Sequence, residues 1–321
     1  MELGRGTKHN ERKSTMNLKR NLSKRIWLQR YLLILTLPAV LWMIIFNYIP
    51  MYGVIIAFQE YTPFKGFIHS PWLGFDNFKE LFNDPTFRES LTNTFKISIA
   101  KLVFGFPAPI VLSLLLNELV FKRFKRIVQS LTYLPYFVSW VLVVGFMYTL
   151  LDPDTGVISK LLVKLGIVGS DVMLMGDAHS FLSLVVITEI WKNIGWNSII
   201  YLAAIAGIDP QLYEAAVVDG ANRFKRVWHI TLPSLKPTII ILLILSIGGL
   251  VNSNFDQMFL MQNSMTQDAA NVLAVYSYKM GLVSGRFSYG TAIGLFQSLV
   301  AFMLMYAANY SSRRLTKESL F

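Results

Sequence analysis

The chain has 321 residues, of which 54% are hydrophobic and only 15% charged, so it is far more apolar than a soluble domain. It contains no cysteine, which excludes a disulfide framework, a thiolate metal site and a cysteine nucleophile. The formal charge of +11 would suit a nucleic-acid partner, but the basic residues gather at the ends of apolar segments, as they do in membrane proteins.

Residues 1–30 form a basic tail with nine lysines and arginines. We expect this tail to be solvated and to become an interfacial segment near Ile26. It is too long and too polar for the start of a signal peptide, and the apolar stretch behind it is too long for a signal-peptide core. An uncleaved first membrane span is therefore expected.

Six apolar segments follow, each long enough to cross a hydrocarbon core of about 30 Å. They are residues 31–57, 95–118, 128–151, 180–207, 237–260 and 289–310. This pattern predicts an all-α polytopic membrane protein with six transmembrane helices. The transmembrane domain would occupy residues 31–310, with a cytoplasmic C-terminal tail at 311–321.

Two of these segments contain prolines: Pro38 and Pro50 in the first, and Pro107 and Pro109 in the second. Proline bends a membrane helix and is tolerated where neighbouring groups satisfy the freed carbonyls. A bent bundle fits a transporter that opens alternately to each side, and it also fits many channels.

The connecting segments alternate in charge. Lysine and arginine cluster at 122–126, at 223–236 and after 312, whereas 60–93, 152–179 and 261–289 are poorer in both. The positive-inside rule places the basic segments in the cytoplasm. Both termini are then expected to be cytoplasmic, together with the segment after the fourth span.

That fourth connection, Tyr213 to Pro233, is too polar to span a bilayer and has specific local chemistry. Asp209 is a good N-cap, Pro210 suits the first helical position, and Gly220 can adopt the left-handed conformation that ends a helix. A second short helix is expected from about Asn222 to His229. Pro233 is expected to stop it, which would give a helix-turn-helix lying on the membrane.

The order of residues in this connection resembles the EAA loop of binding-protein-dependent ABC importer permeases. The matching residues are Glu214, Ala215 and Ala216, then Asp219, Gly220 and Ala221, then Ile230, Leu232 and Pro233. The resemblance implies a coupling loop over 209–236 that docks into a cleft of a cytoplasmic ATPase. The alternatives are an interfacial connector without a partner and a soluble DNA-binding helix-turn-helix, which the flanking spans argue against.

Polar side chains inside spans four and five are costly in lipid, so they are expected to face the bundle interior or water. In span four, Glu189, Lys192, Asn193, Trp196 and Asn197 share one helix face, and Tyr201 lies further along. Span five carries Asn252, Asn254 and Asp256 near its outer end. Aromatic planes beside amides and charged groups suit a sugar. Alternatively, Glu189 and Lys192 simply neutralise each other and the asparagines tie helices together.

The resemblance gives these residues a role, because sugar permeases of this family line their path from the spans before and after the EAA loop. The segments NYIPMYGVIIAFQEY and WLGFDNFKELFNDPTFRESLTNT resemble the branch that handles complex oligosaccharides, such as alginate or pectin fragments. The aromatic residues of the second segment could contact a solute-binding protein directly, or they could equally be packing for a short interfacial helix. Lys192 makes an anionic saccharide conceivable, and Glu189 offsets it.

The resemblance further implies a second permease subunit, two ATPase copies, an extracytoplasmic solute-binding protein and a bacterial cytoplasmic membrane. No phosphate-binding loop or catalytic motif occurs and the four histidines are scattered, so we expect no enzyme activity, metal or cofactor on this chain. ATP and Mg would be bound by the partner ATPase. The alternatives are an ion-coupled secondary transporter using Glu189 or Asp256, although no inverted repeat is evident, and a non-transporting scaffold subunit.

Overall fold

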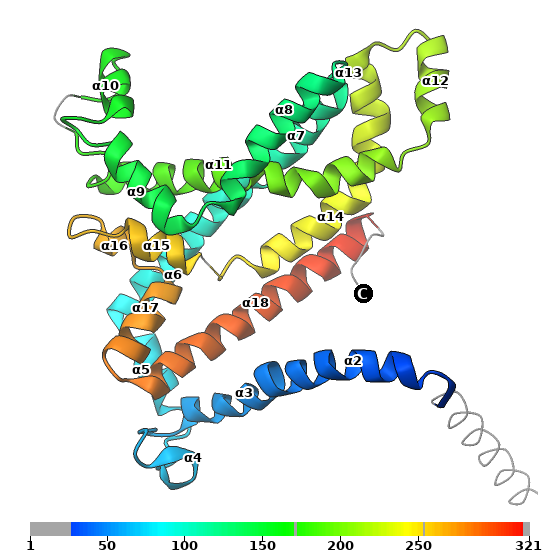
Figure 1. Cartoon of the computed structure of the whole chain (residues 1–321). Coiled ribbons are helices and arrows are strands. Elements are labelled where there is room, and N and C mark those ends of the chain that lie inside the picture. Colours follow the sequence, from blue (N-terminus) through cyan, green and yellow to red (C-terminus); the bar gives the residue numbers. More distant parts are fainter. Residues whose placement is uncertain (1–26, 170–171, 253, 317–321) are drawn as a thin grey trace, which may run out of the picture. The chain divides into compact units, whose positions relative to one another are not determined.

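A computed structural model describes residues 27–169, 172–252 and 254–316, and within these ranges the chain is helical with no β-strand beyond an isolated bridge between Gln59 and Trp72 (Figure 1). The all-α prediction is confirmed. The basic tail was predicted over residues 1–30, and residues 1–26 of it lie outside the described part of the chain. The chain divides after Ile55 into two compact units.

The first unit is the first predicted span. It consists of α2 (Arg30–Met43), the π-helical segment η1 (Ile44–Tyr48) and α3 (Ile49–Met51), and the 3₁₀ segment η2 (Tyr52–Phe58) leads out of it. Together 30–58 form one helical run that is long and apolar enough to cross a membrane. Pro50 follows η1 directly after Ile49.

The second unit begins with two short helices and the second span. These elements are α4 (Gly66–His69), α5 (Asp76–Asn83), α6 (Pro85–Ala100), the π-helical segment η3 (Lys101–Gly105) and α7 (Pro107–Glu118). The run 85–118 starts ten residues before the predicted span. It does so because Asp84 caps α6, its carboxylate accepting from the Thr86 N–H at 2.8 Å, and the polar stretch that follows is helical.

The third predicted span is broken in the middle. It consists of α8 (Lys122–Tyr133), the 3₁₀ turn η4 (Leu134–Phe137) and α9 (Trp140–Leu150), with a bend of 102° between the two parts. Pro135 lies in the turn, and the Ser139 side chain caps α9. After α10 (Val157–Lys164) comes the fourth predicted span, which is the 29-residue helix α11 (Ala178–Ala206).

The fifth predicted span, 237–260, is also interrupted, because α14 ends at Gly248 and the next helix starts at Phe255. The sixth continues to Thr316, so the C-terminal tail predicted at 311–321 begins inside a helix. The elements from the fourth span onward are α12 (Pro210–Val218), α13 (Arg223–Arg226), π-helical η5 (Val227–Thr231), α14 (Leu232–Gly248), α15 (Phe255–Met261), α16 (Gln267–Ala270), α17 (Leu273–Tyr278), π-helical η6 (Lys279–Val283) and α18 (Phe287–Thr316).

Four helical runs among the described residues are long and apolar enough to cross a membrane, and the bent pair makes five. They are Arg30–Phe58, Pro85–Glu118, Arg223–Gly248, Phe287–Arg314 and the pair at 122–150. With α11 they account for all six predicted segments.

Two apolar clusters hold the second unit together. One joins α9, α11, α15 and α17 through residues such as Val144, Val185 and Met258. The other joins α5, α6, α17 and α18 through Leu81, Phe87, Tyr276, Tyr289 and Ile293. Inside a membrane, close van der Waals packing of such side chains holds helices together, because lipid is as apolar as they are.

The second cluster has a polar centre at Asp84. Its Oδ2 accepts hydrogen bonds from the hydroxyls of Tyr276 and Tyr289, the latter at 3.0 Å. Partial burial disfavours the charged carboxylate, but these bonds and the Thr86 N–H outweigh it and hold the pKa of Asp84 below its usual value. The carboxylate therefore stays ionised and ties the start of α6 to α17 and α18.

Helices α11 and α8 approach each other very closely at Gly195. A Cβ on this residue would lie 2.1 Å from the Thr132 carbonyl oxygen and 2.9 Å from the Tyr133 ring. Only glycine allows the two backbones to approach this closely.

We predict that Gly195→Ala destabilises the fold by about 1–3 kcal/mol, because the added methyl forces α8 and α11 apart. Thermal unfolding in detergent measures this as a lower Tm. Gly145→Ala on α9 is the matched control, since a Cβ there meets nothing within 4 Å. Equal Tm values for the two variants would contradict the close contact.

Candidate functional site

A cavity of about 400 Å³, lined by both apolar and polar side chains, lies between α6, η3, α7, α11, α14 and the residues Gly249, Leu250, Asn252 and Asn254 that follow α14. Its polar lining side chains are Ser98, Lys101, Glu189, Asn193, Asn197, Tyr201, Ser246, Asn252 and Asn254. The sequence predicted six of these: Glu189, Asn193, Asn197, Tyr201, Asn252 and Asn254. The cavity therefore brings together most of the predicted polar face of α11 with the break that follows α14.

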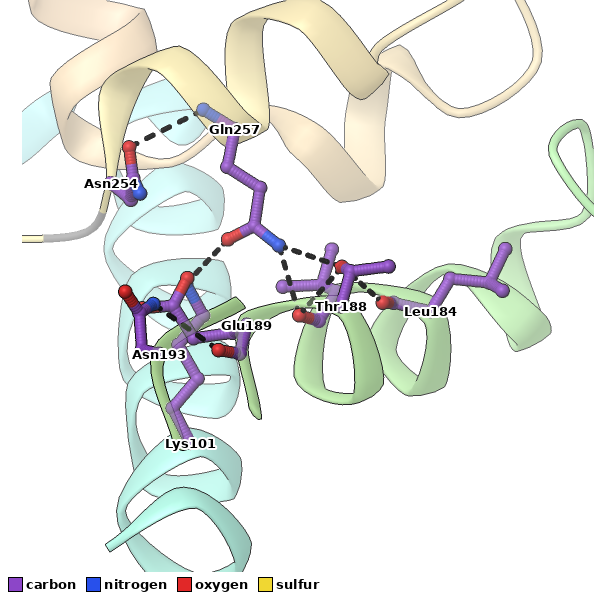
Figure 2. A network of polar contacts seen from close by, with 8 residues as sticks. Lys101, Leu184, Thr188, Glu189, Asn193, Asn254 and Gln257 are labelled. Atoms are coloured by element: carbon purple, nitrogen blue, oxygen red, sulfur yellow. Dashed lines mark hydrogen bonds and ion pairs between the residues drawn. The ribbon is translucent and has the colours of Figure 1, made fainter. Parts of the chain in front are cut away.

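Three elements meet in a polar network beside this cavity (Figure 2). The Lys101 ammonium on η3 donates to Gln257 Oε1 on α15 at 2.8 Å and lies 3.4 Å from Glu189 Oε2 on α11. The other Glu189 oxygen accepts from the Asn193 amide at 2.9 Å. One ion pair and two amides thus link three helical segments at the cavity wall.

Gln257 is held in a single orientation. Its side chain is fully buried, and its Nε2 donates to the Val185 carbonyl at 2.9 Å and to Thr188 Oγ1 at 3.0 Å. Both acceptors lie on α11, so the amide oxygen must point the other way, toward Lys101. Asn254 caps α15, with its Oδ1 accepting from the Gln257 N–H at 3.4 Å.

Lys101 is absent from the sequence-based set of site residues, although it is the only cation lining the cavity among the described residues. A signal was present, because a single lysine inside an otherwise apolar span is expected to have a functional or buried partner. It lies inside the predicted span 95–118, directly after α6 ends at Ala100.

Three predicted path residues lie outside the cavity lining. Asp256 is exposed in the first turn of α15. Trp196 stacks on Tyr136, with ring centroids 4.4 Å apart and planes 4° from parallel, and meets the edge of Phe137. It packs against the bend between α8 and α9.

Lys192 is the third, and it is buried against the same bend. Its ammonium donates to the carbonyls of Pro135 at 3.2 Å, Tyr136 at 2.8 Å and Val138. The Pro135 carbonyl also accepts from the Val138 N–H at 3.1 Å, whereas the carbonyls of Tyr136 and Val138 lie where the chain turns between η4 and α9, and Lys192 supplies their donor. Glu189 and Lys192 do not neutralise each other as one alternative proposed, because Glu189 forms its ion pair with Lys101. Lys192 therefore does not present its charge to the cavity.

We predict that Lys192→Met destabilises the fold by about 1–3 kcal/mol, because the carbonyls of Tyr136 and Val138 at the bend would lose their donor. Thermal unfolding in detergent is the measurement. Lys160→Met on the exposed face of α10 removes the same charge and should leave Tm nearly unchanged. A Tm for Lys192→Met as high as for this control would indicate that the bend needs no internal donor.

The second candidate region is the connection between α11 and α14, whose first arm forms as predicted. The Asp209 carboxylate caps α12 through the Gln211 N–H at 2.9 Å, and Pro210 occupies the first turn. The helix ends at Gly220, which has a φ of +75°. The Ala221 N–H bonds to the Ala216 carbonyl at 2.8 Å and the Gly220 N–H to Val217 at 3.0 Å, a Schellman motif.

The second arm differs from the prediction, because Pro233 does not stop it. Asn222 caps α13, and the helix then continues through η5 into α14 as one run of 26 residues from Arg223 to Gly248. The wide π-helical turns of η5 come directly before Pro233 and let the chain pass it without a break. Tyr213 OH and Thr231 Oγ1, 2.9 Å apart, tie the two arms together.

The motif residues of this connection are mostly accessible. Glu214, Ala215, Asp219, Gly220 and Pro233 are exposed, whereas Ala216, Ala221, Ile230 and Leu232 are half-buried. Exposed apolar side chains surround them: Val218 is 87% exposed, Phe224 73% and Trp228 58%. An acidic side chain beside exposed apolar surface is typical of a protein-binding face.

Both arms lead directly to the cavity. On one side, Asn197 and Tyr201 line it before α11 ends at Ala206. On the other side, Leu242 and Ser246 line it near the end of α14. Figure 1 shows α11 and α14 leading without a break from this connection, and both helices carry residues that line the cavity.

The chain is similar to a known protein family and to several known proteins. Residues 105–317 match the family model described as binding-protein-dependent transport system inner membrane component. Protein LplB of Bacillus subtilis is 45% identical over 292 residues, which cover 91% of both chains. The polygalacturonan/rhamnogalacturonan transport system permease protein YteP of the same organism is 42% identical over 293 residues, again 91% of both.

Two solved structures are also similar to this chain. The chain is 38% identical to a chain in the crystal structure of a bacterial ABC transporter involved in the import of the acidic polysaccharide alginate. The TM-score is 0.84, and the match covers 92% of this chain and 99% of that one. A second structure, of a bacterial alginate ABC transporter in complex with an alginate pentasaccharide-bound periplasmic protein, matches with a TM-score of 0.83.

Proposed function

This chain belongs to the binding-protein-dependent transport system inner membrane components, and we propose that it guides a saccharide along the cavity under control of the loop Tyr213–Pro233. It is the sugar permease subunit of an ABC importer, a multi-pass protein of the inner membrane. It is not an enzyme, because the ATPase of such importers is a separate subunit. Family membership overturns the ion-coupled transporter and scaffold alternatives.

The observation that carries the proposal is the rigid connection from the loop to the cavity. The Schellman turn at Gly220 and the Tyr213–Thr231 contact fix the two arms of the loop to each other. A displacement of this loop is transmitted by α11 and by the 26-residue run ending in α14, both of which line the cavity. Glu214, exposed on α12, is the contact point for the ATPase.

The mechanism follows from this geometry. ATP binding closes the ATPase dimer, which draws the loop with it, and the attached helices shift so that the cavity opens outward. Hydrolysis releases the loop and the cavity opens inward. Glu189, Asn193, Asn197, Tyr201, Asn252 and Asn254 offer hydrogen bonds to sugar hydroxyls as the substrate passes.

Partners and orientation complete the proposal. ATP use by a partner ATPase and pairing with a second permease follow from the family. We further infer two ATPase copies, each holding ATP and Mg, and a solute-binding protein that delivers the saccharide. Both termini and the loop face the cytoplasm, because lysine and arginine concentrate on that side.

We predict that Glu214→Lys abolishes recovery of the ATPase with this chain, because charge reversal at an exposed docking residue opposes binding. Co-purification from detergent should fall at least about tenfold. Asp154→Lys reverses an exposed acidic residue after α9 and should leave recovery unchanged. Undiminished recovery with Glu214→Lys would remove the loop from the ATPase contact.

We predict that Gly220→Val uncouples ATP hydrolysis from transport, because a β-branched residue resists the φ of +75° that the turn requires. Gly220→Asn tolerates this conformation and should retain coupling. The measurement is saccharide uptake per ATP hydrolysed by the reconstituted transporter. A valine variant as tightly coupled as the asparagine variant would show that the turn geometry is dispensable.

A further inference from the structure

The cavity wall carries two charged side chains among the described residues, and they have opposite signs. Lys101 Nζ and Glu189 Oε2 are 3.4 Å apart, and their side chains are 17% and 26% exposed. Lys192 on α11 is bound to carbonyls at the bend and does not line the cavity. The wall that this chain contributes is therefore electrically balanced.

The position of the cation is fixed. Buried Gln257 presents its amide oxygen to Lys101 at 2.8 Å, and its own N–H groups are held by Val185 and Thr188. A lysine ammonium has three donors, and the contacts with Gln257 and Glu189 account for two. The remaining donor is available to an acceptor in the cavity.

The anion is fixed in the same way. Glu189 receives Lys101 on one oxygen and the Asn193 amide on the other. A carboxylate can accept about four hydrogen bonds, so it retains acceptor capacity beside the donor of Lys101. Adjacent donors and acceptors of this kind match neighbouring hydroxyls on a sugar ring, and Asn197, Asn252 and Asn254 add amides to the same wall.

We propose that the Lys101–Glu189 pair determines specificity by making this wall neutral, so that the sugar units passing it are uncharged and are recognised through their hydroxyls. This inference rests on the proposed function of the cavity as a saccharide path. A carboxylated sugar unit would have to displace Glu189 from Lys101 or lie beside it, and like charges at such distances repel. Uncharged units make the same hydrogen bonds without that penalty.

The absence of cysteine from the chain permits a direct test. Asn197→Cys places one thiol on the cavity wall, eight residues and about 12 Å along α11 from Glu189. The assembled transporter is treated with an anionic and a cationic methanethiosulfonate of similar size, and the ratio of their labelling rates on this chain reports the local potential. Ser264→Cys in an exposed loop is the reference thiol.

We expect the rate ratio for the Asn197→Cys thiol to equal that for the Ser264→Cys thiol in the otherwise unchanged chain. Glu189→Gln should shift it toward the anionic reagent and Lys101→Met toward the cationic one, each on the order of tenfold. The double variant should return the ratio to its starting value, which separates a charge effect from a folding defect. A ratio that already favours the anionic reagent strongly in the unchanged cavity would overturn the proposal.

A second measurement addresses the sugar itself. Galacturonate trimer and its carboxyl-reduced, uncharged counterpart are compared for protection of the Asn197→Cys thiol from labelling. Protection by the uncharged trimer at lower concentration supports the inference, and protection by the acidic trimer at equal or lower concentration overturns it. These readouts do not depend on ATPase docking, so a failure of the loop experiments would be seen separately.

Discussion

A membrane helix that bends or breaks must satisfy its freed backbone groups inside the protein, because lipid provides no hydrogen-bond partner. This constraint explains the most unusual placement of a charged residue in the molecule. Lys192 extends from α11 to three carbonyls at the bend between α8 and α9. Close contact of the same helices at Gly195 brings the lysine within reach.

The same local distortion of the helix precedes several prolines. Three π-helical segments, Ile44–Tyr48, Lys101–Gly105 and Val227–Thr231, each end two residues before a proline: Pro50, Pro107 and Pro233. A π-helical turn shifts the hydrogen-bond register by one residue, which removes the clash that proline causes with the preceding turn. The helix therefore stays continuous. The π-helical segment η3 also contains Lys101, which lies at the cavity wall.

Sequence reasoning succeeded where the determining chemistry is local. The capping of α12 by Asp209 and its termination at Gly220 depend on neighbouring residues alone, so both could be predicted. Helical periodicity likewise identified a polar face on α11. The continuation of the helix past Pro233 was missed, because π-helical turns have no reliable sequence signal. Tertiary contacts limited the rest of the prediction: Glu189 and Lys192 share a helix face, yet one pairs with Lys101 and the other with carbonyls more than fifty positions earlier.

The two helices that join loop and cavity have a thermodynamic consequence for the substrate. If occupancy of the cavity favours one spacing of α11 and α14, the loop adopts the corresponding geometry with it. Linkage then requires that the ATPase and the saccharide alter each other's binding by the same factor. Where the saccharide strengthens ATPase binding, an empty cavity leaves the loop in its weaker-binding form, and ATP hydrolysis without transport is limited.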